Sequence, residues 1–139
     1  MSTVIVNTLT GTTTAGSISV TGEGNSTTTN LQQGLVKSWA DFTMASTPSA
    51  DDSFNLASIT DSATGKMGIN ATNAFASTNY APQGHSNGTT GDTFSVTVQV
   101  GLKQNQTITT STTAYEFSSY VSDYVDAIHN YTLTVGDLA

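Results

Sequence analysis

The sequence predicts an all-β protein, an antiparallel β-sandwich or jelly-roll module preceded by an extended N-terminal strand-forming arm. Three observations predict this class. β-Branched and aromatic residues recur in alternating patterns along the whole length. Stretches rich in Gly, Ser, Thr and Asn divide these patterns into seven or so short strands, and no segment has the period of a convincing helix. Short strands with frequent turn signals are typical of sandwiches and jelly rolls.

Residues 1–33 are predicted to form the arm, with a role in attachment and oligomerisation. Three consecutive apolar residues open it, so a strand there carries apolar side chains on both faces and needs cover on both. The Thr- and Gly-rich stretch 10–16 offers no such cover, and a second short strand at 18–20 leads into the polar connector 22–30. We therefore expect the arm to pack on another chain through its apolar side chains, namely Val4, Ile5, Val6, Leu9, Ile18 and Val20.

Residues 34–139 are predicted to form a β-sandwich surface module. Its first strand is expected to place Val36, Ala40, Phe42 and Met44 on one face and Lys37, Trp39 and Asp41 on the other. Residues 54–59 read as a strand that reverses at 61–65, where Gly65 is available for a positive φ. Met67, Ile69 and Ala71 return from this turn, which predicts a hairpin.

The second half of the module is predicted from alternation alone. Phe94, Val96, Val98 and Val100 alternate without a break and indicate a half-buried strand. A last strand is expected to bury one parity, formed by Val125, Ala127, His129, Tyr131, Leu133 and Val135. Residues 82–91 are predicted to be the longest loop, and residues 115–124 fit both a strand and a helical turn.

Composition excludes several classes of function. The chain of 139 residues carries a formal net charge of −7, with three lysines and no arginine, so it lacks the cation cluster that a nucleic-acid binder needs. It has no cysteine, which rules out disulfides and Cys-ligated zinc. No apolar run approaches the roughly 18 residues of a membrane span, and the start lacks a secretory signal, so we expect no membrane insertion.

No catalytic residue, cofactor or metal ligand is predicted. His85 lies in the expected polar loop, where a solvent-exposed role is favoured over catalysis or metal binding. For His129 a packed, hydrogen-bonded side chain is favoured over an ion site on a trimer axis. Asp51 with Asp52, and Asp123 with Asp126, lack the spacing of a dedicated calcium loop; Asp51 and Asp52 are expected to end a loop and cap the next element.

The tyrosines are the recognition signal that the sequence retains. Tyr80, Tyr115, Tyr120 and Tyr124 offer amphipathic rings that suit half-polar ligands such as sugars. Packing in the core or between subunits is the favoured interpretation. The candidate receptor contacts are Tyr80, His85, Tyr115 and Tyr120.

A specific pattern covers the first eighty residues. Residues 34–42 read G-L-V-K-S-W-A-D-F, residues 51–61 read D-D-S-F-N-L-A-S-I-T-D, and Gly65 and a strand ending in Thr72 precede the triplet N-Y-A at 79–81. The opening M-S-T-V-I-V-N-T-L-T-G adds a further element. In these elements, their order and their spacing, the chain resembles phage virion fibre and decoration proteins, head fibres or tail-fibre knobs of marine and cyanobacterial phages.

The resemblance implies a homotrimer on the surface of a virion, made in the host cytoplasm. The expected function is that of a non-enzymatic structural protein, a short trimeric decoration protein or fibre attached through its N-terminal arm. The short arm favours the capsid over the tail, with the major capsid protein as the expected partner. The alternative is a receptor-binding tail-fibre tip that recognises host surface polysaccharide. A hydrolytic tip enzyme is least favoured, since glycoside hydrolysis needs a placed pair of carboxylates.

Overall fold

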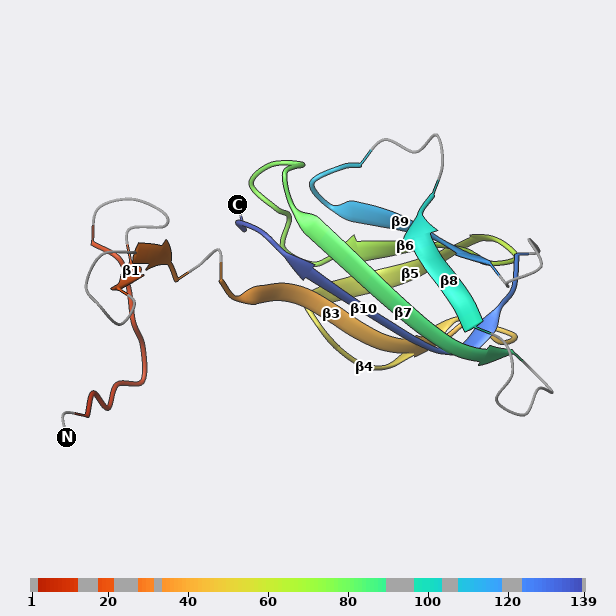
Figure 1. Ribbon diagram of the computed structural model, residues 1–139, viewed down its shortest axis with the longest axis horizontal. Helices are drawn as coiled ribbons and strands as arrows, with labels where there is room; N and C mark the ends of the chain where they lie inside the picture. The colour runs from red at the N-terminus through yellow and green to blue at the C-terminus, as the bar shows by residue number, and fades with distance from the viewer. Residues whose placement is uncertain are drawn as a thin grey trace. The chain divides into compact units, whose positions relative to one another are not determined.

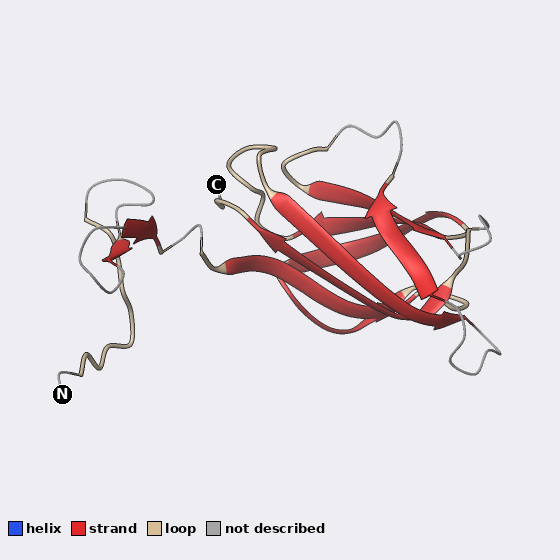
Figure 2. Cartoon of the chain, in the orientation of Figure 1, coloured by secondary structure: helices blue, strands red, loops and turns tan. Residues whose placement is uncertain are grey.

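The computed structural model describes residues 3–12, 18–21, 28–31, 34–89, 97–103, 108–118 and 124–138. It divides into two units, Met1–Leu35 and Val36–Ala139. Every regular element within the described residues is a strand (Figures 1 and 2). This confirms the all-β class. The strands are β1 (Ser19–Thr21), β2 (Thr28–Asn30), β3 (Val36–Thr43), β4 (Ser49–Phe54), β5 (Leu56–Ala63), β6 (Lys66–Ala71), β7 (Ala81–Thr89), β8 (Thr97–Leu102), β9 (Thr112–Ser118) and β10 (Ala127–Val135).

In the described part of the N-terminal unit, two short strands form an antiparallel pair. β1 pairs with β2 in the register Ser19 to Asn30, and the Leu31 N–H donates a hydrogen bond of 2.9 Å to the Ile18 carbonyl. Residues 3–12 carry no strand, so the strand expected at 4–6 is not formed by a single chain. The reason is physical: a strand satisfies its backbone donors and acceptors only when a neighbouring strand lies beside it.

The module is a sandwich of two antiparallel sheets, which confirms the predicted architecture. β4, β3, β10 and β7 form one layer in that order, and β8, β9, β6 and β5 form the other. β8 joins the layers, because residues 97–98 pair with β7 whereas residues 99–102 pair with β9. Figure 1 shows β8 crossing between the two layers at this junction. β10 lies between β3 and β7, so this C-terminal strand is a central strand of the first layer.

The core lies between the two layers. Phe42 from β3 and Phe117 from β9 are both fully buried, and their rings meet edge to face at a centroid distance of 6.2 Å. Met44 and Met67 are 1% exposed and fill the space beside these rings. Ala40 and Ile69 are also buried, so the inward faces of the strands at 36–44 and 66–71 are largely as predicted.

Asn55 holds the corner where the chain leaves one sheet for the other. It has a positive φ of 58°, a conformation that Asn tolerates better than most residues. Its side-chain amide donates hydrogen bonds to the carbonyls of Lys37 (3.0 Å) and Asn73 (3.1 Å), and its Oδ1 accepts one from the Asn73 N–H (2.7 Å). The strand predicted across 54–59 is therefore two strands, with Phe54 at the end of β4 and the bend at Asn55.

The hairpin of β5 and β6 is confirmed. Gly65 turns the chain with a φ of 66°, and its N–H donates to Asp126 Oδ1 at 2.8 Å. A Cβ at this position would lie 2.5 Å from the Phe117 carbonyl oxygen, so glycine is required by both conformation and space.

Two predictions about this sheet are wrong. Residues 82–89, expected in a loop, lie in β7. Its inward positions are small: Ser86 is buried, and a Cβ at Gly84 would meet Val100 of the opposite sheet. Ala127 is buried as predicted, but from His129 onward β10 buries the opposite parity. Asn130, Thr132 and Thr134 face the core there, and His129, Tyr131 and Leu133 face outward. The inward polar side chains are small or hydrogen-bonded, so their burial is tolerated. His129 is therefore exposed rather than packed.

Candidate functional site

The outer face of the sheet β4-β3-β10-β7 carries the candidate site. Strand register places Phe54, Trp39, Leu133 and Gln83 side by side across the four strands, and we call this row the apolar rung. The next row along the strands consists of Asp52, Asp41, Tyr131 and His85, and we call it the polar rung. Directly opposed residues on one face of an antiparallel pair have Cβ atoms about 5 Å apart, so each rung is a continuous row of side chains.

The large side chains of these rungs are left open to solvent. The exposed fractions are 37% for Trp39, 39% for Leu133, 44% for Tyr131 and 50% for Phe54. Burying such side chains is normally favourable by about 25 cal/mol per Å² of apolar surface. A cluster of exposed apolar residues on one sheet face is therefore typical of a surface that binds a ligand or another protein.

A groove of about 380 Å³ runs over β10, between β3 and β7. We call it the β10 groove. Its outward side chains are Trp39 and Asp41 from β3, Tyr131 and Leu133 from β10, and Gln83 and His85 from β7. The volume lies within the range of small-ligand sites, about 300 to 1,000 Å³.

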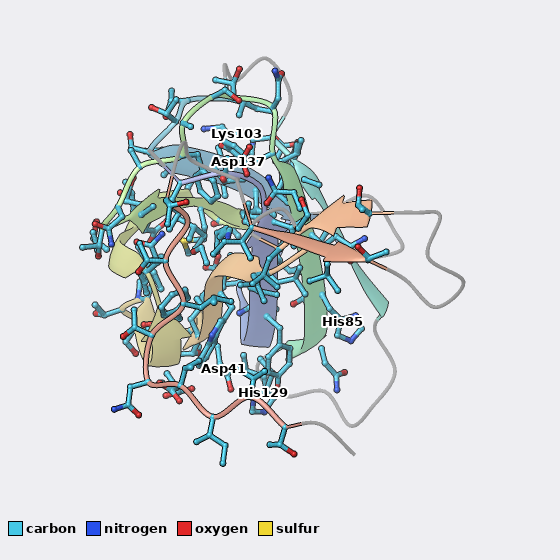
Figure 3. All side chains as sticks on the ribbon, turned by 90° about the vertical axis from the view of Figure 1, so that its left-hand side faces the viewer. Asp41, His85, Lys103, His129 and Asp137 are labelled. Atoms are coloured by element: carbon cyan, nitrogen blue, oxygen red, sulfur yellow. The ribbon has the colours of Figure 1, made fainter. Side chains whose placement is uncertain are left out.

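The polar groups of the groove are available to a ligand. Among the hydrogen bonds and ion pairs between described residues, none involves the side chains of Asp41, Gln83, His85 or Tyr131. Figure 3 shows Asp41, His85 and His129 in the lower half of the view, whereas Lys103 and Asp137 lie in the upper half. One carboxylate, one imidazole and one amide thus line an aromatic surface, where they can exchange hydrogen bonds with a ligand.

Two of the four candidate receptor contacts are core residues. Tyr80 is 9% exposed; its hydroxyl donates to the Thr109 carbonyl at 2.8 Å, and its ring stacks on Phe75 at 4.5 Å. Tyr115 is 2% exposed, and burial raises its pKa to about 12, an effect that the Thr134 hydroxyl partly offsets. Burial likewise raises the pKa of Tyr80. Both rings thus pack in the interior, as favoured from the sequence, and neither presents a surface to a receptor in this structure.

Of the other two candidate receptor contacts, one is exposed on β7 and one lies outside the described residues. His85 is exposed on β7 and lines the β10 groove, rather than lying in a loop. Tyr120, Phe94, Val96 and Asp123 lie outside the described residues.

Of the two acidic pairs, Asp51, Asp52 and Asp126 lie within the described residues. Asp51 and Asp52 lie within the exposed strand β4 rather than at the end of a loop, and Asp52 Oδ1 accepts the Ser53 N–H at 2.8 Å. Asp126 holds the Gly65 turn. Across the described parts of the chain, no group of three acidic or histidine side chains is placed to hold a metal ion.

The arm residues are exposed where the structure describes them. Val4 is 83% and Ile5 90% exposed, Val6, Leu9 and Val20 are between half and two thirds exposed, and Ile18 is half-buried beside β1. Exposed apolar side chains in this density are the feature expected of a segment that packs on another chain.

Sequence reasoning missed Trp39, Tyr131 and Leu133 as site residues. The sequence does place Trp39 on the outward face, between Lys37 and Asp41, and a tryptophan on a solvent-facing parity is the signal that could have identified the site. Lys37 is the exception on that face, since it is 6% exposed beside the β-bulge that shifts the register at Val36.

The chain matches no protein-family model, no curated protein and no solved structure. Among the residues that the structure describes, no helix is long and apolar enough to cross a membrane.

Proposed function

We propose that this protein is a non-enzymatic structural component of a phage particle, a short trimeric decoration protein or fibre. In this proposal the N-terminal arm attaches the chain to the virion and to its own copies, and the β-sandwich is displayed on the surface. The major capsid protein is the proposed partner, and the capsid is favoured over the tail.

One observation carries the proposal: the apolar residues of the arm have no cover, whereas the module has a complete core. Val4 and Ile5 are more than four-fifths exposed, and Phe42 and Phe117 are fully buried. A chain whose module buries its own core and whose arm exposes apolar side chains is suited to assembly, in which other chains bury those side chains. The resemblance at residues 34–81 supports the same role.

The receptor-binding alternative loses support from its original residues. Tyr80 and Tyr115 are buried, so of its described contacts only His85 reaches the surface. The structural role depends on none of these rings.

The test is quaternary. Light scattering of the purified chain is expected to give three times the 14.4 kDa of one chain. The double variant Val4→Asp/Val6→Asp is expected to reduce this mass, because a strand that carries two carboxylates cannot be buried against a partner. The matched control is Thr8→Asp/Thr10→Asp, which adds the same charge at exposed polar positions of the same arm.

The outcomes separate the parts of the proposal. A monomer mass at micromolar concentration would contradict the trimer. An equal loss of assembly in both variants would show that charge, not apolar contact, is responsible. Mass spectrometry of intact virions then tests location: copies comparable to the number of capsomers support the capsid, and a few trimers per particle restore the tail.

A further inference from the structure

The β10 groove has a division of chemistry that the structural role does not use. Its apolar half is formed by Trp39 and Leu133, which are directly opposed in the strand register. Its polar half is formed by Asp41 and His85, which stand on either side of Tyr131. An exposed aromatic surface thus adjoins hydrogen-bonding groups on the same three strands.

This arrangement is held rigidly. β3, β10 and β7 are neighbours within one layer, and residues 130–135 of β10 are paired on both sides. Below the groove, Asn130 and Ser86 are buried and joined by a hydrogen bond of 2.6 Å. Side chains that project from central strands are positioned more precisely than side chains on loops, so the groove needs little reorganisation to bind.

The ligand must match both halves. A sugar ring has a face of C–H groups, which packs on an aromatic ring, and a rim of hydroxyls, which donate to a carboxylate and exchange hydrogen bonds with an imidazole or an amide. A purely apolar ligand leaves Asp41 and His85 without partners, at a cost in affinity.

The charge of the site narrows the chemical class of the ligand further. Asp41 and Asp52 are neighbours in the polar rung, and the chain as a whole carries a formal charge of −7. Two carboxylates attract hydroxyl donors and repel anionic groups. We therefore propose that the β10 groove binds a neutral oligosaccharide, with Trp39 and Tyr131 packing on sugar rings and Asp41 and His85 hydrogen-bonding to their hydroxyls.

A second copy of the chain is the competing occupant of this face. Packing two copies over the polar rung would remove Asp41 and Asp52 from water against a partner with the same excess of negative charge. Burial of unpaired carboxylates is costly, so the polar rung favours a hydroxyl-rich ligand over a second sheet. The saccharide site is independent of the trimer and of the place of the chain on a particle.

The chain contains a reporter for this site, because Trp39 is its one tryptophan. Maltohexaose, chitohexaose and mannotetraose are titrated separately. At least one of them is expected to shift the Trp39 emission to shorter wavelength and to protect Trp39 from acrylamide quenching, with a Kd of about 1 mM or tighter. Hexagalacturonate, an anionic comparator, is expected to give no protection.

Two variants test the two kinds of contact in the proposal, ring packing through Tyr131 and hydrogen bonding through Asp41. Tyr131→Ala and Asp41→Asn are each expected to weaken binding about tenfold or more. The matched controls are Tyr124→Ala, which removes a ring that is also 44% exposed but lies outside the groove, and Asp61→Asn, on the exposed strand β5. Both controls are expected to bind as the parent chain does. Asp41→Asn keeps the shape of the side chain, so it tests the site even if Tyr131→Ala fails to fold.

The opposing results are distinct. Absence of any Trp39 response to the three neutral saccharides at about ten times that concentration would overturn the proposal, as would equal loss in the variants and their controls. Protection of Trp39 that appears on raising protein concentration alone, with a smaller assembly mass for Tyr131→Ala, would assign the face to a second copy and also overturn it. A monomeric but saccharide-binding chain would support the groove and contradict only the trimer.

Discussion

Asn130 is expected to be the most important polar side chain for the stability of the module. It is fully buried, and its amide donates to the carbonyls of Phe42 (3.1 Å) and Ala127 (2.8 Å). Its Oδ1 accepts the Ser86 hydroxyl at 2.6 Å. One side chain thus satisfies groups from β3, β7 and β10 at the centre of the first layer.

Replacement of Asn130 by Ala removes all three hydrogen bonds at once. The Ser86 hydroxyl keeps a second acceptor, the His129 carbonyl at 3.3 Å, so the main loss is at the two carbonyls. A buried polar group left without its partner costs about 1 to 3 kcal/mol, and the lost side-chain volume adds a smaller amount. We expect the free energy of unfolding to fall by about 3 kcal/mol. Asn130→Asp is expected to cost more, because a carboxylate would face two carbonyl oxygens.

Urea unfolding at neutral pH and fixed protein concentration measures this difference, provided that the dependence on urea is unchanged. The control is Asn87→Ala, an exposed residue of β7, for which a change within about 0.5 kcal/mol is expected. A loss below about 1 kcal/mol for Asn130→Ala would refute the reasoning, since it would mean that water or a rearranged strand replaces the amide.

Three further outcomes are expected. Gly84→Ala should destabilise the module by about 1 to 3 kcal/mol, because its Cβ would lie 2.4 Å from a Val100 methyl carbon. The control is Gly101→Ala, whose Cβ meets nothing within 4 Å. Equal urea midpoints for the two variants would count against the close packing of β7 on the second layer. The free energy of unfolding should fall by about 2 kcal/mol as the pH rises from 10 to about 12, because folded Tyr115 keeps a proton that the unfolded chain has lost. Alkaline urea titrations should show a flatter profile in Tyr115→Phe, and an unchanged profile would contradict this assignment. Raising sodium chloride from dilute buffer to about 0.5 M should move the melting temperature by less than about 5 °C. Salt screens surface ion pairs, and only one, at 3.6 Å, joins described residues. A larger shift would indicate a specific ion site.

Local signals predicted the parts of the fold that depend on neighbours in sequence. The hairpin at 56–71 follows from a turn that needs a positive φ at Gly65. The inward face of β3 follows from alternation, with Ala40, Phe42 and Met44 all buried as expected. In both cases the apolar residues are large and their alternation is regular, so the choice of face has one favourable solution.

The prediction was wrong where the apolar side chains do not face the core. In β10, the alternation of Tyr131 and Leu133 identified a strand and a shared face, but the opposite face, with Asn130 and Thr132, is the buried one. Alternation says which residues share a face and does not say which face the second sheet covers. That choice depends on the hydrogen bonds of Asn130 and on the close approach of the opposite sheet to β7, neither of which is local in sequence.

The amino-acid sequence by itself determined the fold class of this protein, an all-β sandwich, and its composition, with few charges and no cysteine. Tertiary structure decided the location of the candidate site. Residues of the β10 groove come from strands as far apart in the chain as Trp39, His85 and Tyr131, and only the pairing of β10 with both β3 and β7 brings them onto one face. Alternation is a pattern of residues that are neighbours in sequence, whereas a binding surface on a sheet depends on strand order. Strand order in turn depends on the packing of the whole chain.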